Sequence, residues 1–163
     1  MTSWFALRVR PKHERSCALH LTSRGLEPFT PEYSVRRQWS DRMKVVSLPL
    51  FPGYVFCRFK GEQRRDVLTA PGVASIVSFG DVPAEVTEQE IANVRTIVKS
   101  GAPYGPWPYL RAGERVRIEE GCMKGLCGTL LRDQDRFRVV VNVELLQRSV
   151  AVEIDRESVQ RPD

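Results

Sequence analysis

A segment rich in proline and glycine near the middle of the chain limits the fold more than any other feature of the sequence. Residues 100–108 read SGAPYGPWP and contain three prolines and two glycines. Proline has no backbone N–H and a fixed φ, so such a segment is excluded from helix interiors and from central paired strands. We therefore expect a linker at residues 101–110, which joins a domain at residues 1–100 to a second domain at residues 111–163.

The length and composition permit two small folded domains. A chain of 163 residues is long enough, because a module of about 60 residues can bury a marginal core. Its residues are 42% hydrophobic and 28% charged, which is typical of globular proteins. No apolar run approaches the roughly 18 residues that span a bilayer, and the N-terminus lacks the pattern of a signal peptide. The sequence predicts a cytoplasmic protein that does not enter a membrane.

Neither catalysis nor cofactor binding is indicated by the side chains. The four cysteines are Cys17, Cys57, Cys122 and Cys127. We expect them to be reduced thiols, and Cys122 and Cys127 lack the CxxC spacing of a zinc site. Motifs for phosphate loops, dinucleotides, zinc proteases and serine hydrolases are absent. We expect a binding protein without a cofactor, not an enzyme.

Basic residues cluster in one short segment of the first domain. The net charge of +5 favours polyanionic partners only where the cations gather. The clustered cations are Arg36, Arg37, Arg42 and Lys44. They surround Trp39, and Ser40-Asp41 has the composition of a turn. The segment predicts an exposed basic hairpin in which Trp39 either stacks on a ligand or packs within the hairpin.

The apolar periodicity predicts an α+β fold for the first domain, with helices on a mainly antiparallel sheet. Strands are predicted at 4–10, 45–50, 54–59 and 73–79, and helices at 12–24, 63–69 and 87–100. The second domain has short strand patterns and turns throughout. Its strands are predicted at 114–118, 126–132, 137–145 and 149–154. Several short strands in so few residues favour a small closed β-barrel.

An unusually aromatic segment, LPLFPGYVF, occupies residues 48–56. One interpretation is a buried strand that follows a tight turn. In the other, Pro52 and Gly53 redirect the backbone so that Phe51 and Tyr54 reach the surface. Together with Trp4, these rings would then line a concave apolar patch of the kind that docks proteins.

Several motifs resemble the NusG-like transcription factors, in the expected order and over nearly the whole chain. They are SWFALRVRPKHE near the start, RRQWSDR at 36–42, LPLFPGYVF at 48–56 and APGVASIVSFG at 70–80. These are most similar to specialised paralogues such as RfaH and the UpxY antiterminators of surface-polysaccharide operons. GERVRI at 113–118 and the glycines after it resemble the KOW module of the family. The resemblance implies an NGN-like antiparallel α/β sandwich followed by a KOW, SH3-like barrel.

The resemblance also implies a partner for the first domain. Family members dock through an apolar cavity on the paired clamp helices of the largest RNA polymerase subunit. The matching positions are Trp4, Phe51, Pro52 and Tyr54, and Phe79 adds to them. In the specialised paralogues, the first helix contacts the non-template single strand of DNA. The matching residues are Arg10, His13 and His20, with Lys12 and Arg24 nearby. The alternative for each of these five is an ordinary solvated side chain.

For the barrel, the family implies contact with a small-subunit ribosomal protein or with termination factor Rho. Leu145 and Leu146 occupy the position of the contacting loop, although two leucines at a strand end are also typical of a core. The expected function is a monomeric elongation and antitermination factor that suppresses pausing and termination. The alternative is a ribosome-associated or RNA-binding KOW-domain protein that does not bind polymerase. Ala70 and Pro71 replace polar or basic residues that some paralogues use to contact DNA. The DNA sequence that recruits a relative therefore cannot be carried over to this protein.

Overall fold

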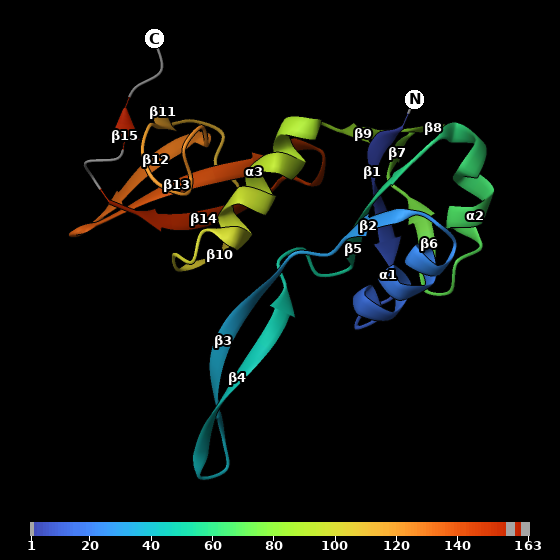
Figure 1. The fold of residues 1–163 in the computed structure, drawn as a ribbon, viewed down its shortest axis with the longest axis horizontal. Coiled ribbons are helices and arrows are strands. Elements are labelled where there is room, and N and C mark those ends of the chain that lie inside the picture. The colour runs from blue at the N-terminus through green and yellow to red at the C-terminus, as the bar shows by residue number, and fades with distance from the viewer. Residues whose placement is uncertain (1, 156–158, 161–163) are drawn as a thin grey trace. The chain divides into compact units, whose positions relative to one another are not determined.

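The computed structural model describes residues 2–155 and 159–160. The chain divides into two compact units, Met1–Glu88 and Gln89–Asp163. Both are built mainly from antiparallel strands, as Figure 1 shows. Within the described part of the chain, every helix is too short or too polar to span a bilayer. The α+β fold class predicted from the sequence is confirmed.

Unit 1 is organised around a five-stranded sheet with β1 and β5 at its centre. The strands are β1 (Ser3–Val9), β2 (Glu27–Phe29), β5 (Tyr54–Phe59), β6 (Val73–Ile76) and β9 (Glu85–Val86). The order is β2-β5-β1-β6, and β9 also pairs with β1. In the central pair, Phe5 lies opposite Cys57 and Leu7 opposite Val55. The resulting row of buried apolar side chains gives the sheet its core face.

Two helices accompany this sheet in unit 1: α1 (Glu14–Ser23) and α2 (Arg64–Leu68). Cys17 and Leu21 of α1 and Val67 of α2 are fully buried in the same cluster as the strand residues. Helix α1 begins two residues later than predicted, because Lys12 adopts a left-handed φ of 67°. It ends where Gly25 has a φ of 79°, the backbone conformation that helix C-termini commonly require and that glycine adopts without strain.

The thiols of Cys17 and Cys57 are buried in this core, which raises their pKa values from about 9.0 to about 11 and about 12. A raised thiol pKa means that the folded state holds its proton more tightly than the unfolded chain. The associated stability is complete below pH 9 and is lost as the pH rises towards 11 to 12. We expect the urea midpoint to fall between pH 8 and pH 10.5. The Cys57→Ala variant should show a smaller fall over that range, and an equal fall in both proteins would contradict the assignment.

A long two-stranded arm interrupts unit 1 between β2 and β5. It consists of β3 (Glu32–Trp39) and β4 (Arg42–Pro49), joined at Ser40-Asp41. Figure 1 shows it extending as a twisted ribbon from the five-stranded sheet. The predicted basic hairpin is therefore present and is longer than expected, because the separate strand predicted at 45–50 forms part of β4. A smaller hairpin pairs β7 (Ser78–Phe79) with β8 (Val82–Pro83), so the single strand predicted at 73–79 is divided.

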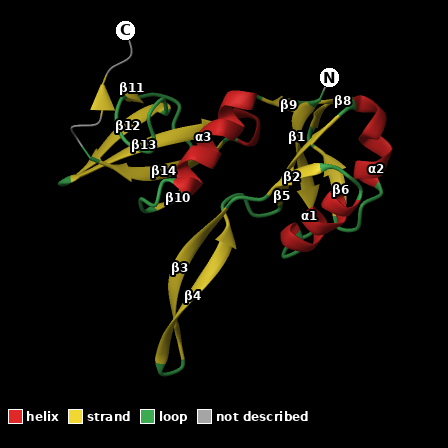
Figure 2. Ribbon diagram, viewed as in Figure 1, coloured by secondary structure: helices red, strands yellow, loops and turns green. Residues whose placement is uncertain are grey.

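Unit 2 contains a six-stranded antiparallel sheet in the order β10-β14-β13-β12-β11-β15. The strands are β10 (Tyr104–Trp107), β11 (Glu114–Ile118), β12 (Cys127–Asp133), β13 (Arg136–Val143), β14 (Arg148–Ile154) and β15 (Val159–Gln160). Val139, Val140 and Val141 are all buried, so β13 is covered on both faces. Figure 2 shows that strands dominate this unit, alongside α3 (Glu88–Lys99). The β-branched valines favour the strand conformation, because their side chains fit the pleated surface of a sheet.

The segment predicted as a linker contains a paired strand. Tyr104–Trp107 forms β10 at one edge of the second sheet, where Pro106 lies opposite Val150. Proline is tolerated there because an edge strand can direct its missing donor away from the ladder. The structure also groups nearly all of α3 with unit 2, whereas the sequence assigned this helix to the first domain. A functional division at residues 1–100 and 111–163 stays a prediction.

Candidate functional site

An apolar pocket of about 410 Å³ lies in unit 1, where the base of the arm meets the start of α1. Its lining residues are Pro11, Lys12, Glu14, Tyr33, Leu48, Pro49, Pro52 and Gly53. Tyr33 and Leu48 face each other across the arm. They and the prolines supply apolar surface, while Lys12 and Glu14 contribute one charge of each sign. A pocket of this composition suits an apolar side chain carried by a protein partner.

The turn at Pro52-Gly53 is held from two directions. The buried carboxylate of Glu14 accepts a hydrogen bond from the Gly53 backbone N–H at 3.0 Å. The Gly53 carbonyl accepts another from the Val9 N–H at 2.9 Å. Gly53 has a φ of 84°, which favours glycine over residues with a side chain. Glu14 therefore couples the first turn of α1 to one wall of the pocket.

The base of the arm is also fixed to the body of unit 1. The guanidinium of Arg15 binds both carboxylate oxygens of Glu32, each at 2.7 Å. This bidentate geometry is the most directional form of an ion pair. Just outside the two strands, the Leu50 N–H donates to the Pro31 carbonyl at 2.9 Å. These contacts determine where Tyr33 and Leu48 lie relative to α1.

Trp4 and Phe51 do not lie on the surface, contrary to the interpretation of three exposed rings. Each is only 2% exposed. Phe56 packs edge-on against Phe51 at 5.3 Å between centroids, and Phe29 links Phe56 to Trp4 at 6.2 and 6.4 Å. Trp4 and Phe56 share the sheet face opposite to the Cys17 core, since side chains alternate along each strand. The aromatic excess therefore builds a second buried layer, separate from the Cys17 core.

The remaining residues of the predicted apolar site differ in exposure and in position relative to the pocket. Pro52 is exposed and lines the pocket, and Tyr54 is half-buried in β5. Phe79 is 75% exposed on β7 and does not line the pocket. The structure thus brings Pro52 to the pocket, places Trp4 and Phe51 in the core and leaves Phe79 on a separate surface.

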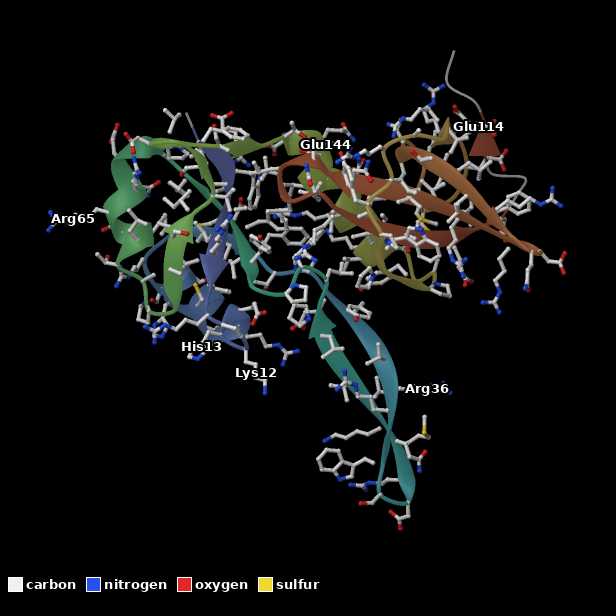
Figure 3. All side chains as sticks on the ribbon, turned by 180° about the vertical axis from the view of Figure 1, so that it is seen from behind. Lys12, His13, Arg36, Arg65, Glu114 and Glu144 are labelled. Atoms are coloured by element: carbon white, nitrogen blue, oxygen red, sulfur yellow. The ribbon has the colours of Figure 1, made fainter. Side chains whose placement is uncertain are left out.

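All five predicted DNA-contacting residues are exposed at or near α1. These are Arg10, Lys12, His13, His20 and Arg24. Figure 3 shows Lys12 and His13 projecting outward where the helix begins. Lys12 also lines the apolar pocket, so the cationic surface and the pocket adjoin.

Arg24 has a structural role in this fold. Its guanidinium donates to the Asp66 carbonyl and to the Thr69 hydroxyl, both at 2.7 Å. We expect Arg24→Ala to lower the unfolding free energy by about 1 kcal/mol, because the hydrogen bonds from the end of α1 to the C-terminal end of α2 are lost. Arg10→Ala, which removes an exposed cation of the same kind, should change it by less than about 0.5 kcal/mol. Urea denaturation measures both, and equal values would refute the assignment.

Leu145 and Leu146 lie in a short 3₁₀ turn, Glu144–Leu146, between β13 and β14. Both are half-buried. The turn is attached to α3 through the Glu144 N–H, which donates to the Glu90 carboxylate at 2.7 Å. Gln147 then takes a left-handed φ of 50°, and β14 begins at the next residue. The two leucines are therefore partly accessible in a turn whose backbone is held in place.

Sequence reasoning missed Tyr33, Leu48, Pro49 and Glu14 as pocket residues. The available signal was the pairing of the hairpin, because a turn at Ser40-Asp41 places Tyr33 opposite Leu48. The meeting of Glu14 with Gly53 spans 39 positions and has no local signature. Among residues 2–155 and 159–160, no group of three or more His, Cys, Asp or Glu side chains is arranged to hold a metal.

The comparisons with known proteins agree on one family. Residues 2–95, more than half of the chain, match the family model described as "NusG: Transcription termination factor nusG". The chain is 20% identical to the transcription termination/antitermination protein NusG of Helicobacter pylori strain 26695, over 99% of each chain. It is 26% identical to the Lactococcus lactis protein of the same name, covering 96% of this chain and 91% of that one.

A solved structure of Thermotoga maritima NusG has a similar fold. The TM-score is 0.56 at 19% identity, and the match covers 100% of this chain and 98% of the other. At this identity the likeness concerns the fold alone. The family model matches residues 2–95, which include the motifs of unit 1, and the chain belongs to the NusG family.

Proposed function

We propose that this protein is a transcription elongation and antitermination factor that binds RNA polymerase through the apolar pocket of unit 1. The observation that carries the proposal is the position of this pocket, inside the segment that matches the NusG family model. Its partner would be the paired clamp helices of the largest polymerase subunit. A helix presents apolar side chains at regular spacing, and one such side chain would enter between Tyr33, Leu48 and Pro52.

The buried aromatic layer supports this contact indirectly. Trp4 and Phe51 hold the β1 and β5 region rigid from within, while Pro52 and part of Tyr54 remain available to the partner. Phe79 would make a separate contact, since it is exposed on another hairpin. We therefore assign direct polymerase binding to Pro52, Tyr54 and the arm residues Tyr33 and Leu48, and a supporting role to Trp4 and Phe51.

The cations around α1 would hold the non-template strand of the transcription bubble. Arg10 and Lys12 would contact phosphates, and His13 and His20 would stack on or hydrogen-bond to exposed bases. All four are exposed. The proximity of Lys12 to the pocket would let one face of the unit engage polymerase and DNA together. Arg24 would act through the packing of α1 on α2.

For the second unit, we infer a KOW-type SH3-like barrel that recruits a further partner through Leu145 and Leu146. A small-subunit ribosomal protein and Rho are the two candidates that the family resemblance provides. The similarity of the motifs to RfaH and UpxY proteins supports a role at particular operons, including those for surface polysaccharides. Such a factor would be monomeric in the cytoplasm and would act by holding the polymerase clamp, without catalysis.

Transcription by purified bacterial RNA polymerase tests the proposed function. On a template with a hairpin pause and a Rho-dependent terminator, we expect the protein to shorten the pause and to increase read-through. The effect should saturate with protein concentration. Unchanged pausing and read-through at saturating protein, on templates with and without operon-leader sequences, would overturn the proposal.

A further inference from the structure

The arm formed by β3 and β4 presents two faces of different chemistry. Paired residues share a face and alternate along an antiparallel ribbon. One face carries four successive cross-strand pairs: Tyr33 with Leu48, Val35 with Val46, Arg37 with Lys44, and Trp39 with Arg42. The other carries Ser34 with Ser47, Arg36 with Val45, and Gln38 with Met43. We call the first of these the Trp39 face; it runs from the apolar pocket to the tip of the arm.

The outer half of the Trp39 face combines an exposed ring with three cations. The Trp39 side chain is 62% exposed, and the Lys44 Nζ lies 5.4 Å from its ring centroid. Arg37 and Arg42 are also exposed. A cation over an indole orients the ring without covering both of its sides. The ring is therefore held in place and remains accessible at the end of the arm.

The positive charges of the arm are balanced by few carboxylates within the arm itself. Between residues 33 and 48 there are four cations and one carboxylate, Asp41, which lies in the turn. Within the part of the chain that the structure describes, none of Arg36, Arg37, Arg42 and Lys44 forms an ion pair. Isolated two-stranded ribbons are marginally stable, and an exposed tryptophan adds an unfavourable apolar surface. This arrangement is explained if the arm binds a polyanion with flat apolar groups.

We propose that the Trp39 face is a binding surface for single-stranded nucleic acid. Trp39 stacks on an unpaired base, while Arg37, Arg42 and Lys44 contact the phosphates on either side. An acidic peptide would satisfy the cations but would offer no planar group to Trp39. A duplex would satisfy the cations but keeps its bases stacked on one another. This surface goes beyond the proposed contacts at α1, because it uses a different element and different residues.

Binding of a fluorescein-labelled oligo(dT) 15-mer to the full chain, followed by anisotropy at low salt, tests the proposal. We expect Trp39→Ala to weaken binding about tenfold, as is typical for loss of one stacked base. Met43→Ala is the matched control, because Met43 is 58% exposed on the opposite face; it should change affinity less than twofold. Arg37→Gln should weaken binding several-fold more than Arg36→Gln, since only Arg37 lies on the Trp39 face.

Three comparative outcomes would overturn the proposal. The first is an equal loss of affinity in the two variants of a pair, either Trp39→Ala and Met43→Ala or Arg37→Gln and Arg36→Gln. The second is tighter binding of a 15-base-pair duplex than of the single strand. The third is competition by poly-glutamate that is as effective as competition by the single strand. Absence of measurable oligonucleotide binding would also overturn it. Circular dichroism of each variant excludes a folding defect as the cause. Because no polymerase is present in this assay, its failure would leave the expected effect on pausing and read-through standing, and the reverse also holds.

Discussion

Leu48→Glu is expected to weaken binding to RNA polymerase about 100-fold. The Leu48 side chain is half-buried in the wall of the apolar pocket opposite Tyr33. If a clamp-helix side chain fills this pocket, the substitution removes about 1.5 to 3 kcal/mol of apolar burial. It also places a carboxylate in a desolvated contact, which costs further free energy. About 2.7 kcal/mol corresponds to a factor of 100 in the dissociation constant.

Ser47→Glu provides the matched control for this substitution. Ser47 is the neighbouring residue in β4, is exposed, and points to the opposite face of the arm. The Ser47→Glu substitution introduces the same charge at nearly the same position as Leu48→Glu. A general electrostatic effect on polymerase binding would therefore appear in both variants. We expect Ser47→Glu to change the dissociation constant less than threefold. Surface plasmon resonance with immobilised core polymerase measures both, and similar losses would rule out the pocket as the docking site.

Local patterns predicted the strands that carry the core. The limits expected for 54–59 and 114–118 coincide with β5 and β11, because apolar alternation and flanking turns both mark them. The strand β2 was missed because it is three residues long and contains Pro28. The strand β10 was missed because its prolines are typical of a linker, although an edge strand accepts them. Both segments form strands because they pair with strands distant in sequence, β2 with β5 and β10 with β14.

The candidate site was predicted less completely than the fold. The segment around Pro52-Gly53 was singled out for its aromatic residues, yet Phe51 packs inward against Phe56. Periodicity alone cannot distinguish these outcomes, because both faces of the first sheet are buried and each accepts large rings. The pocket depends on Glu14 and on the arm register, which are tertiary features. The motif therefore led to the segment that lines the pocket through Pro52, but it did not show that Trp4 and Phe51 are buried.

Gly128→Ala is expected to destabilise unit 2 by about 3 kcal/mol, the largest stability effect among the predicted substitutions. Gly128 is buried in β12, opposite Val116 of β11. A Cβ at this position would lie 2.5 Å from Val139 Cγ1 and 2.6 Å from the Val140 carbonyl oxygen. Both neighbours belong to β13, and the carbonyl is backbone, so relief requires β12 and β13 to separate. Glycine inside a strand commonly marks such a close approach.

Gly61→Ala is the control for this prediction, because a Cβ there meets no atom within 4 Å. Amide hydrogen exchange with mass spectrometry distinguishes the two units within the full chain. In Gly128→Ala, peptides from β12, β13 and β14 should exchange about 100-fold faster, since 2.7 kcal/mol corresponds to a factor of 100 in the opening equilibrium. Peptides from β1 and β5 should keep their protection, and Gly61→Ala should leave both units unchanged. Intact protection of β13 in Gly128→Ala would show that the strands accommodate a methyl group without opening.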